Sequence, residues 1–277
     1  MISVHHLDCC TMCVIGGRRL VHERGYLVAH CLLLETERSG LVLVDTGIGT
    51  DDVAAPRRRL GTGFVTFFRP LVDAARTAVR QVEALGFDPA DVRHVVVTHL
   101  DVDHAGGLPD FPHARVHVHI DEHAAAMARA TLNERMRYRT GHWAHGPDWA
   151  LYPSGEGEAW FGFAVAHALA GLPEEILAVP LPGHTRGHSA VAVHAGGRWL
   201  LHAGDAYFHR STVAGPSRRT PPGIRLFERS VAMDRRQVEA NHGRLRELIV
   251  ATSGQVDVFC AHDTTEFDEL ASPAQPN

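Results

Sequence analysis

Residues 95–107 read VVVTHLDVDHAGG and place two histidines and two aspartates within six positions. The four residues are His99, Asp101, Asp103 and His104, and they directly follow a β-branched run. Histidine and aspartate at such spacing are typical ligands of a divalent metal ion. Asp101 stands where a histidine would be the expected donor. The stretch therefore predicts a metal site and raises the question of what Asp101 does in it.

Four further segments share one design, in which a strand-like run ends and a histidine or aspartate follows it. They are VDTG with Asp45, PGHTRGHS with His184 and His188, AGDAYF with Asp205, and CAHD with His262. A strand holds its last residues rigidly, and the loop after it lets a side chain turn inward, which suits a site assembled from distant segments. A metal ion can lower the pKa of its water from 15.7 to about 7, so a nucleophile would exist without a catalytic serine or cysteine. No GxSxG motif competes with this interpretation.

The elements that must position these residues are short runs rich in valine and leucine, bounded by glycine, proline and aspartate. We predict strands at 26–36, 40–47, 93–99, 114–120, 175–183, 189–196, 198–206 and 256–263, and helices at about 72–86, 121–137 and 234–251. The predicted strands form two groups on either side of residues 121–174. We expect one domain over residues 1–270, with a helical and aromatic insertion at about 121–174, and a flexible tail over 271–277.

The insertion concentrates aromatic residues between positions 138 and 163. Such a concentration could form a lid or pocket wall that receives an acyl chain. The alternative is ordinary core packing, and the sequence leaves both interpretations open.

Composition sets the broad class of protein. A chain of 277 residues that is 45% hydrophobic and 21% charged can bury a real core. The net charge of −5 argues against a nucleic-acid or membrane-surface partner, so we expect a small-molecule substrate, with a homodimer possible. The nearly apolar run YLVAHCLLL is far shorter than the ~20 residues that cross a bilayer. Five cysteines without a disulfide-framework pattern and no visible signal peptide fit the cytoplasm.

Taken in this order, the five segments resemble the metallo-β-lactamase superfamily across roughly residues 25 to 265. THLDVDHAGG, PGHTRGHS and GDA place the chain nearest the lactonase and glyoxalase II branch. The resemblance implies an α/β fold, a four-layer αββα sandwich, with a two-metal site at the edge of its sheets. It implies that His99 and His184 bind metal 1, that Asp103, His104 and His262 bind metal 2, and that Asp205 bridges the two. It also implies that Asp45 holds either the loop or a ligand histidine in place.

Asp101 departs from the family pattern, since H-x-H-x-D-H is replaced by H-x-D-x-D-H. In one interpretation Asp101 is itself a ligand of metal 1, which adds negative charge and favours harder metals such as iron or manganese. In a second interpretation the side chain is too short to reach and the site works with metal 2 alone. In a third the site is degenerate, although the remaining ligand-type residues are all present.

The resemblance implies a hydrolase that uses metal-activated water on a lactone, ester or thioester. We expect two divalent ions, zinc first and iron or manganese as alternatives. The catalytic candidates are Asp103 and Tyr207, because the lactonases place a tyrosine just after the bridging aspartate to polarise the substrate carbonyl. Phe208 or His209 could occupy that place instead, and His188 could assist or be a simple turn residue. The alternative functions are an iron-dependent redox enzyme, of the sulfur dioxygenase or oxygen-reducing type, and a phosphodiesterase.

Overall fold

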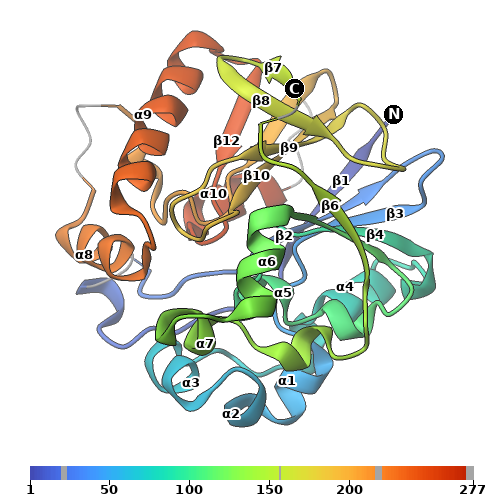
Figure 1. Cartoon of the computed structure of the whole chain (residues 1–277), viewed down its shortest axis with the longest axis vertical. Coiled ribbons are helices and arrows are strands. Elements are labelled where there is room, and N and C mark those ends of the chain that lie inside the picture. Colours follow the sequence, from blue (N-terminus) through green and yellow to red (C-terminus); the bar gives the residue numbers. More distant parts are fainter. Residues whose placement is uncertain (20–23, 156, 216–219, 273–277) are drawn as a thin grey trace.

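The computed structural model describes residues 1–19, 24–155, 157–215 and 220–272, and within them the strands form two six-stranded sheets (Figure 1). The first sheet has the order β1-β2-β3-β4-β5-β6 and the second β12-β11-β10-β9-β8-β7. Their bounds are β1 Ser3–Asp8, β2 His30–Glu35, β3 Leu41–Val44, β4 Val92–Val96, β5 Arg115–His119, β6 Asp148–Tyr152, β7 Glu158–Trp160, β8 Phe163–Ala168, β9 Ile176–Pro180, β10 Ser189–Ala195, β11 Arg198–His202 and β12 Val256–Phe259.

The α-helices lie outside the sheets or in the loops between strands (Figure 1). Their bounds are α1 Thr50–Ala54, α2 Pro56–Arg59, α3 Thr62–Phe68, α4 Ala78–Ala84, α5 Val102–Ala105, α6 Ile120–Ala128, α7 Leu132–Arg137, α8 Pro222–Val231, α9 Arg235–Ala251 and α10 Thr264–Ala271. Helix α4 ends where we expected, because Gly86 just beyond it has a φ of 88° and lets the chain leave the helix. Among the described residues, no helix has the length and apolar character needed to cross a membrane.

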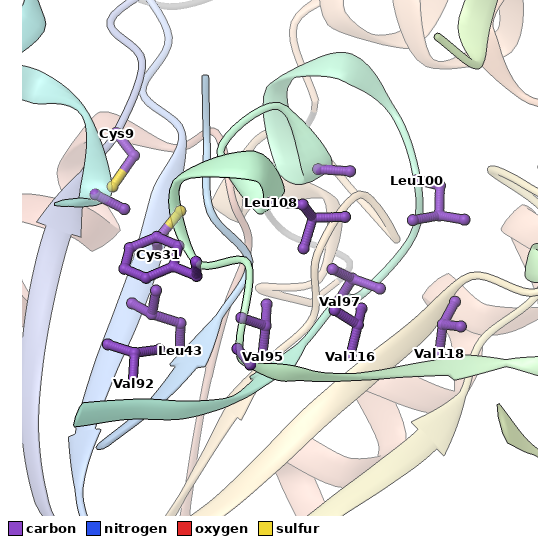
Figure 2. Packing of buried hydrophobic residues seen from close by; sticks show 14 of the residues in the cluster. Cys9, Cys31, Leu43, Val92, Val95, Val97, Leu100, Leu108, Val116 and Val118 are labelled. Atoms are coloured by element: carbon purple, nitrogen blue, oxygen red, sulfur yellow. The ribbon is translucent and has the colours of Figure 1, made fainter. Parts of the chain in front are cut away.

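The sheets are covered on both faces, which makes a four-layer αββα sandwich. One apolar cluster joins β2, β3 and β4 to β9, β10 and β12 and fills the space between the sheets. A second packs the other face of the first sheet under α4 and α6, and a third packs the second sheet under α9. Figure 2 shows part of the cluster over the first sheet, where Cys9, Cys31, Leu43, Val92, Val95, Val97, Leu100, Leu108, Val116 and Val118 pack together. Strands buried on both faces need nearly continuous apolar sequence, as in the LVLV of β3.

Each of the eight predicted strand runs overlaps an observed strand, but the predicted insertion is wrong in its second half. Helices α6 and α7 occupy its beginning, whereas β6 completes the first sheet and β7 and β8 form the edge of the second. Neither the three-residue β7, EAW, nor the six-residue β8, FAVAHA, shows a clear alternation of apolar and polar residues, so they could not be recognised as strands. The division into one domain and a tail stays a prediction, and the tail beyond residue 272 lies outside the described residues.

Strand direction explains why distant motifs meet. In the first sheet β3 and β4 are parallel, so the loops that follow them leave from the same edge. In the second sheet β11 and β12 are parallel, and β9 shares their direction because β10 runs antiparallel to both β9 and β11. The five predicted motifs therefore follow strands whose carboxyl ends can face one region.

Candidate metal centre

A cluster of histidine and aspartate side chains forms where these loops converge. It consists of three overlapping groups whose ligand-type atoms lie within 4.8 Å of one another: His99, Asp101 and His184; His99, His104 and Asp205; and Asp103, His104 and His262. The structure thus brings together all seven residues that we predicted as metal ligands from the sequence. These ligand-type residues come from loops of both sheets, with His99 to His104 following β4 and the others following β9, β11 and β12.

The first half of the cluster contains His99, Asp101 and His184 around one oxygen of Asp205. The Nε2 atom of His184 lies 3.1 Å from Oδ2 of Asp101 and 3.3 Å from Oδ2 of Asp205. The Nε2 atom of His99 lies 3.3 Å from Oδ2 of Asp101 and 3.9 Å from Oδ2 of Asp205. Ligand atoms about 2.0–2.2 Å from a tetrahedral cation are about 3.3–3.6 Å apart, so these spacings fit one.

The second half contains Asp103, His104 and His262 around the other oxygen of Asp205. Oδ1 of Asp205 is 3.2 Å from Nε2 of His104 and 3.0 Å from Nε2 of His262. Oδ2 of Asp103 is 4.0 Å from Nε2 of His104 and 3.8 Å from Nε2 of His262. Because each carboxylate oxygen of Asp205 faces a different half, this residue has the geometry of a bridge.

Hydrogen bonds at the far side of each ring orient the histidines toward the cluster. His104 Nδ1 donates to Oδ2 of Asp45 at 2.8 Å, and His262 Nδ1 donates to the carbonyl of Val28 at 2.6 Å. His99 Nδ1 donates to the hydroxyl of Thr98 at 3.0 Å. A neutral imidazole with Nδ1 protonated has a lone pair on Nε2, so the acceptors turn metal-binding atoms inward.

Asp45 anchors this arrangement as expected from the resemblance. It is fully buried, and besides His104 it accepts the backbone N–H and the hydroxyl of Thr98, both at 2.7 Å. Burial opposes ionisation of Asp45, but His104 beside it lowers its pKa below the ordinary value. Burial of His104 lowers the pKa of its imidazole. Nearby carboxylates outweigh burial and raise this pKa well above the ordinary value, and they belong to Asp205, Asp45 and Asp103.

His188 positions the bridging residue. Its Nδ1 donates to the carbonyl of Leu181 at 2.9 Å, and its Nε2 accepts the backbone N–H of Asp205 at 2.9 Å. Gly204 must be small here, since its φ is 53° and a Cβ atom would lie 2.6 Å from Nε2 of His188. The sequence left the role of His188 open, and the structure makes it a fixed support for Asp205.

Glu122 is a support that sequence reasoning missed. Its Oε1 accepts the backbone N–H of Leu100 at 2.9 Å, and its Oε2 accepts that of Gly187 at 3.1 Å. This buried carboxylate therefore ties the loop after β4 to the loop after β9. No sequence motif marks it, because its partners become neighbours only in the folded chain.

The donor atoms fit a cation for a further reason. Among the described residues, Nε2 of His99, Nε2 of His104, Oδ1 of Asp205 and Oδ1 of Asp101 are buried without a hydrogen-bond partner. Unpartnered buried polar atoms are costly, and a group that satisfies several of them at once would relieve that cost. Nitrogen and carboxylate donors suit zinc, and also iron or manganese.

Asp101 reaches the cluster, contrary to the interpretation in which its side chain is too short. Its Oδ2 also lies 3.1 Å from Nη1 of Arg137, at the end of α7. Although burial raises the pKa of Asp101, Arg137 and His99 hold it well below the ordinary range. Arg137 was not predicted, and nothing in its local sequence distinguishes it.

Tyr207 does not have the catalytic position that we expected. Its side chain is fully buried, and its hydroxyl donates to Oε1 of Glu266 at 3.0 Å in the core of the second sheet. Phe208 takes the place instead, with its ring stacked on that of His262 at a centroid distance of 5.1 Å. His209 bonds Ser211 through Nδ1 at 2.7 Å. The side chain that lies beside the cluster in place of Tyr207 is therefore that of Phe208, which carries no hydroxyl.

A cavity of about 400 Å³ opens onto the cluster and is mainly apolar. Its floor includes Asp101, Asp103, His184, Asp205 and His262. Its walls include Phe64, Phe67 and Phe68 of α3, Phe227 and Val231 of α8, and Phe208. Among the described lining residues none is an aromatic residue of 138–163, so of the two interpretations that the sequence left open, core packing is the one that the structure favours. Tyr138, Trp143, Tyr152, Trp160 and Phe163 are buried in the core instead.

Comparison with known proteins gives a consistent result. The family model of the Metallo-beta-lactamase superfamily matches residues 24–240. A probable metallo-hydrolase of Mycobacterium tuberculosis is 45% identical over 262 residues, which cover 95% of this chain and 80% of that protein. The N-acyl homoserine lactonase AttM of Agrobacterium fabrum is 40% identical over 81 residues, which cover 29% of this chain and 30% of that protein.

Solved structures share the fold. An N-acyl homoserine lactone hydrolase with N-hexanoyl-L-homoserine at its catalytic metal center superposes with a TM-score of 0.70 at 20% identity, covering 99% of this chain and 97% of that one. AidC, a dizinc quorum-quenching lactonase, gives a TM-score of 0.63 at 15% identity and covers 95% of this chain and 88% of that one.

Proposed function

The chain belongs to the metallo-β-lactamase superfamily as a metallo-hydrolase, and we propose that it hydrolyses a lactone or simple ester with an apolar acyl group. The observation that carries this proposal is the apolar cavity whose floor is the histidine and aspartate cluster. Its volume of about 400 Å³ lies within the range of small-molecule sites, toward the lower end. An acyl chain would lie against α3 and α8 with its carbonyl over the cluster.

The proposal includes two divalent cations, zinc first, with iron or manganese as alternatives. When bound, such ions polarise a carbonyl and make water acidic enough to be a nucleophile at neutral pH. His99, Asp101 and His184 would hold one ion, Asp103, His104 and His262 the other, and Asp205 would contact both. Apart from Asp205, each half contains two histidines and one aspartate, so each ion would be bound by the same types of donor.

The side chains around the cluster would orient the substrate and handle its proton. Phe208 and the α3 and α8 aromatic residues would exclude water from the acyl group. Asp103 lies on the cavity floor, and its side chain is 11% exposed. It can accept a proton from the attacking water and return it to the leaving alkoxide as the C–O bond breaks. With Tyr207 turned away, carbonyl polarisation would depend on the metal centre.

The relatives support this substrate class. AttM is named an N-acyl homoserine lactonase, and a structural neighbour carries N-hexanoyl-L-homoserine at its metal center. A cytoplasmic location is part of the same proposal, and the absence of any disulfide among the five cysteines, all of which are described, agrees with it. We further propose a small-molecule substrate without a nucleic-acid partner, and a homodimer as the assembly to test.

The test is a substrate panel with the metal-free protein reloaded with zinc, manganese or iron. The panel contains N-acyl homoserine lactones of different acyl length, aryl esters, glutathione thioesters and phosphodiesters. We expect turnover of lactones or aryl esters that improves with an apolar acyl group and disappears on chelation. Turnover of phosphodiesters alone would refute the proposed substrate class.

A further inference from the structure

The two halves of the cluster have matching donor sets. His99, Asp101 and His184 form one half, two histidines and one aspartate, and the second half repeats this composition. Asp205 offers one carboxylate oxygen to each half. Donor types and formal charge would therefore give two cations similar binding free energies.

Arg137 removes this equivalence. Its Nη1 lies 3.1 Å from Oδ2 of Asp101 and 3.1 Å from Nε2 of His184, both of which are ligand atoms of the first half. In the second half, and among the described residues, Asp103 forms ion pairs with histidines alone. A permanent positive charge therefore contacts one half of the centre and not the other.

The guanidinium is held in this place by the backbone. Nη1 also donates to the carbonyl of His184 at 3.2 Å, and Nη2 donates to the carbonyl of Val231 at 2.5 Å. The side chain is only 9% exposed, so solvent screens its charge weakly. Arg137 is thus fixed beside Asp101 by contacts with two other segments of the chain.

We propose that Arg137 is a positioning residue that makes the two metal sites unequal, so that the Asp103, His104 and His262 site fills first and the Asp101 site fills second. The guanidinium neutralises part of the negative charge of Asp101. Its N–H groups also donate toward the lone pairs of Asp101 and His184 that a cation would use. A second cation must displace or share these interactions. This inference rests on the proposed metal-dependent function, because it assumes that the cluster binds two cations.

The test is stepwise metal binding to the metal-free full chain, without any substrate. Co²⁺ is titrated in competition with a chelator of known affinity, and visible absorption and elemental analysis report each step. We expect the wild-type second dissociation constant to exceed the first by at least tenfold. In Arg137→Gln the second constant should fall at least tenfold, while the first changes less than threefold.

Matched variants separate charge from structure. Arg137→Lys keeps the charge and should resemble the wild type, and Arg139→Gln removes a second arginine of the same cavity and should change neither constant. If Arg137→Gln does not fold, Arg137→Met provides the test, because it removes the charge but keeps an unbranched side chain, and the second constant should fall at least tenfold in the same way.

The outcomes distinguish the two levels of inference. Equal constants in the wild-type chain, or an unchanged or weaker second step in folded Arg137→Gln, would overturn the role of Arg137 while leaving the hydrolase proposal intact. Failure of the wild-type chain to bind any metal would overturn the proposed function itself.

Discussion

Replacing Asp45 by asparagine tests how much the buried carboxylate contributes to the metal centre. Asparagine tolerates the left-handed backbone at this position, where φ is 57°. Its carbonyl oxygen can still accept the N–H of Thr98, but its NH₂ group would face Nδ1 of His104, which now donates to the carboxylate at 2.8 Å. The variant therefore loses the bond that turns Nε2 of His104 toward the cluster.

The size of the effect follows from that one bond. Residues that orient a metal-bound histidine typically contribute 10–100-fold to metal affinity or activity. We therefore expect the dissociation constant of the His104 site to rise by about 10–100-fold, or about 1.4–2.7 kcal/mol. The site of His99 and His184 should change less, because His99 contacts Asp45 only through Thr98.

Stepwise metal titration with chelator competition measures the loss, and kcat/KM at saturating metal reports whether activity recovers. Asp52→Asn is the matched control, because Asp52 is also fully buried and lies 3.1 Å from Nε2 of a histidine, His142, away from the cluster. It should lower thermal stability without changing metal affinity. Wild-type affinity in Asp45→Asn, or an equal loss in Asp52→Asn, would refute the reasoning.

Three other substitutions probe the surroundings of the centre. Asp205→Ala should remove both cations and abolish hydrolysis while circular dichroism stays native, and elemental analysis that finds wild-type stoichiometry would contradict the bridging geometry. Tyr207→Phe should leave kcat/KM unchanged and lower the free energy of unfolding by about 1–3 kcal/mol, because Glu266 loses a buried donor; a large fall in kcat would restore the catalytic role that we rejected. Burial raises the pKa of Glu266 from 4.5 to about 8, so its protonated form stabilises the fold at low pH, and this stability is lost as pH rises from about 5 to 8. Melting temperatures across that range should fall less in Glu266→Gln than in the wild type, and parallel curves would show that Glu266 does not titrate as described.

The seven cluster residues could be found from sequence because each follows a β-branched or apolar run. Val95 and Val96, for instance, predict the strand β4 just before His99. The end of a strand and a ligand-type side chain are both features of the local sequence, so they can be recognised without knowledge of the tertiary structure. The sandwich was likewise foreseeable through the resemblance of the motif order to a known family.

What could not be predicted depends on contacts between distant segments. Arg137 and Glu122 lie in helices with no motif, and only folding places them beside Asp101 and Gly187. Tyr207 was misassigned because the loop after β11 turns Phe208 toward the cavity, a difference of one residue that spacing cannot resolve. The edge strand β7 has three residues and pairs with β8, and β8 in turn is placed by its pairing with β9 rather than by its own pattern.

The convergence of ligand loops from both sheets has a consequence for folding. A cation held by His104 and His262 would link segments that belong to different layers of the sandwich. An unfolded chain cannot present these distant groups together, so the cation would bind the native state almost exclusively. Free metal at 100 times the dissociation constant would then add about 2.7 kcal/mol to the unfolding free energy. The concentration of available metal in the cell would thus regulate how much of this protein survives proteolysis, as well as how much of it is active.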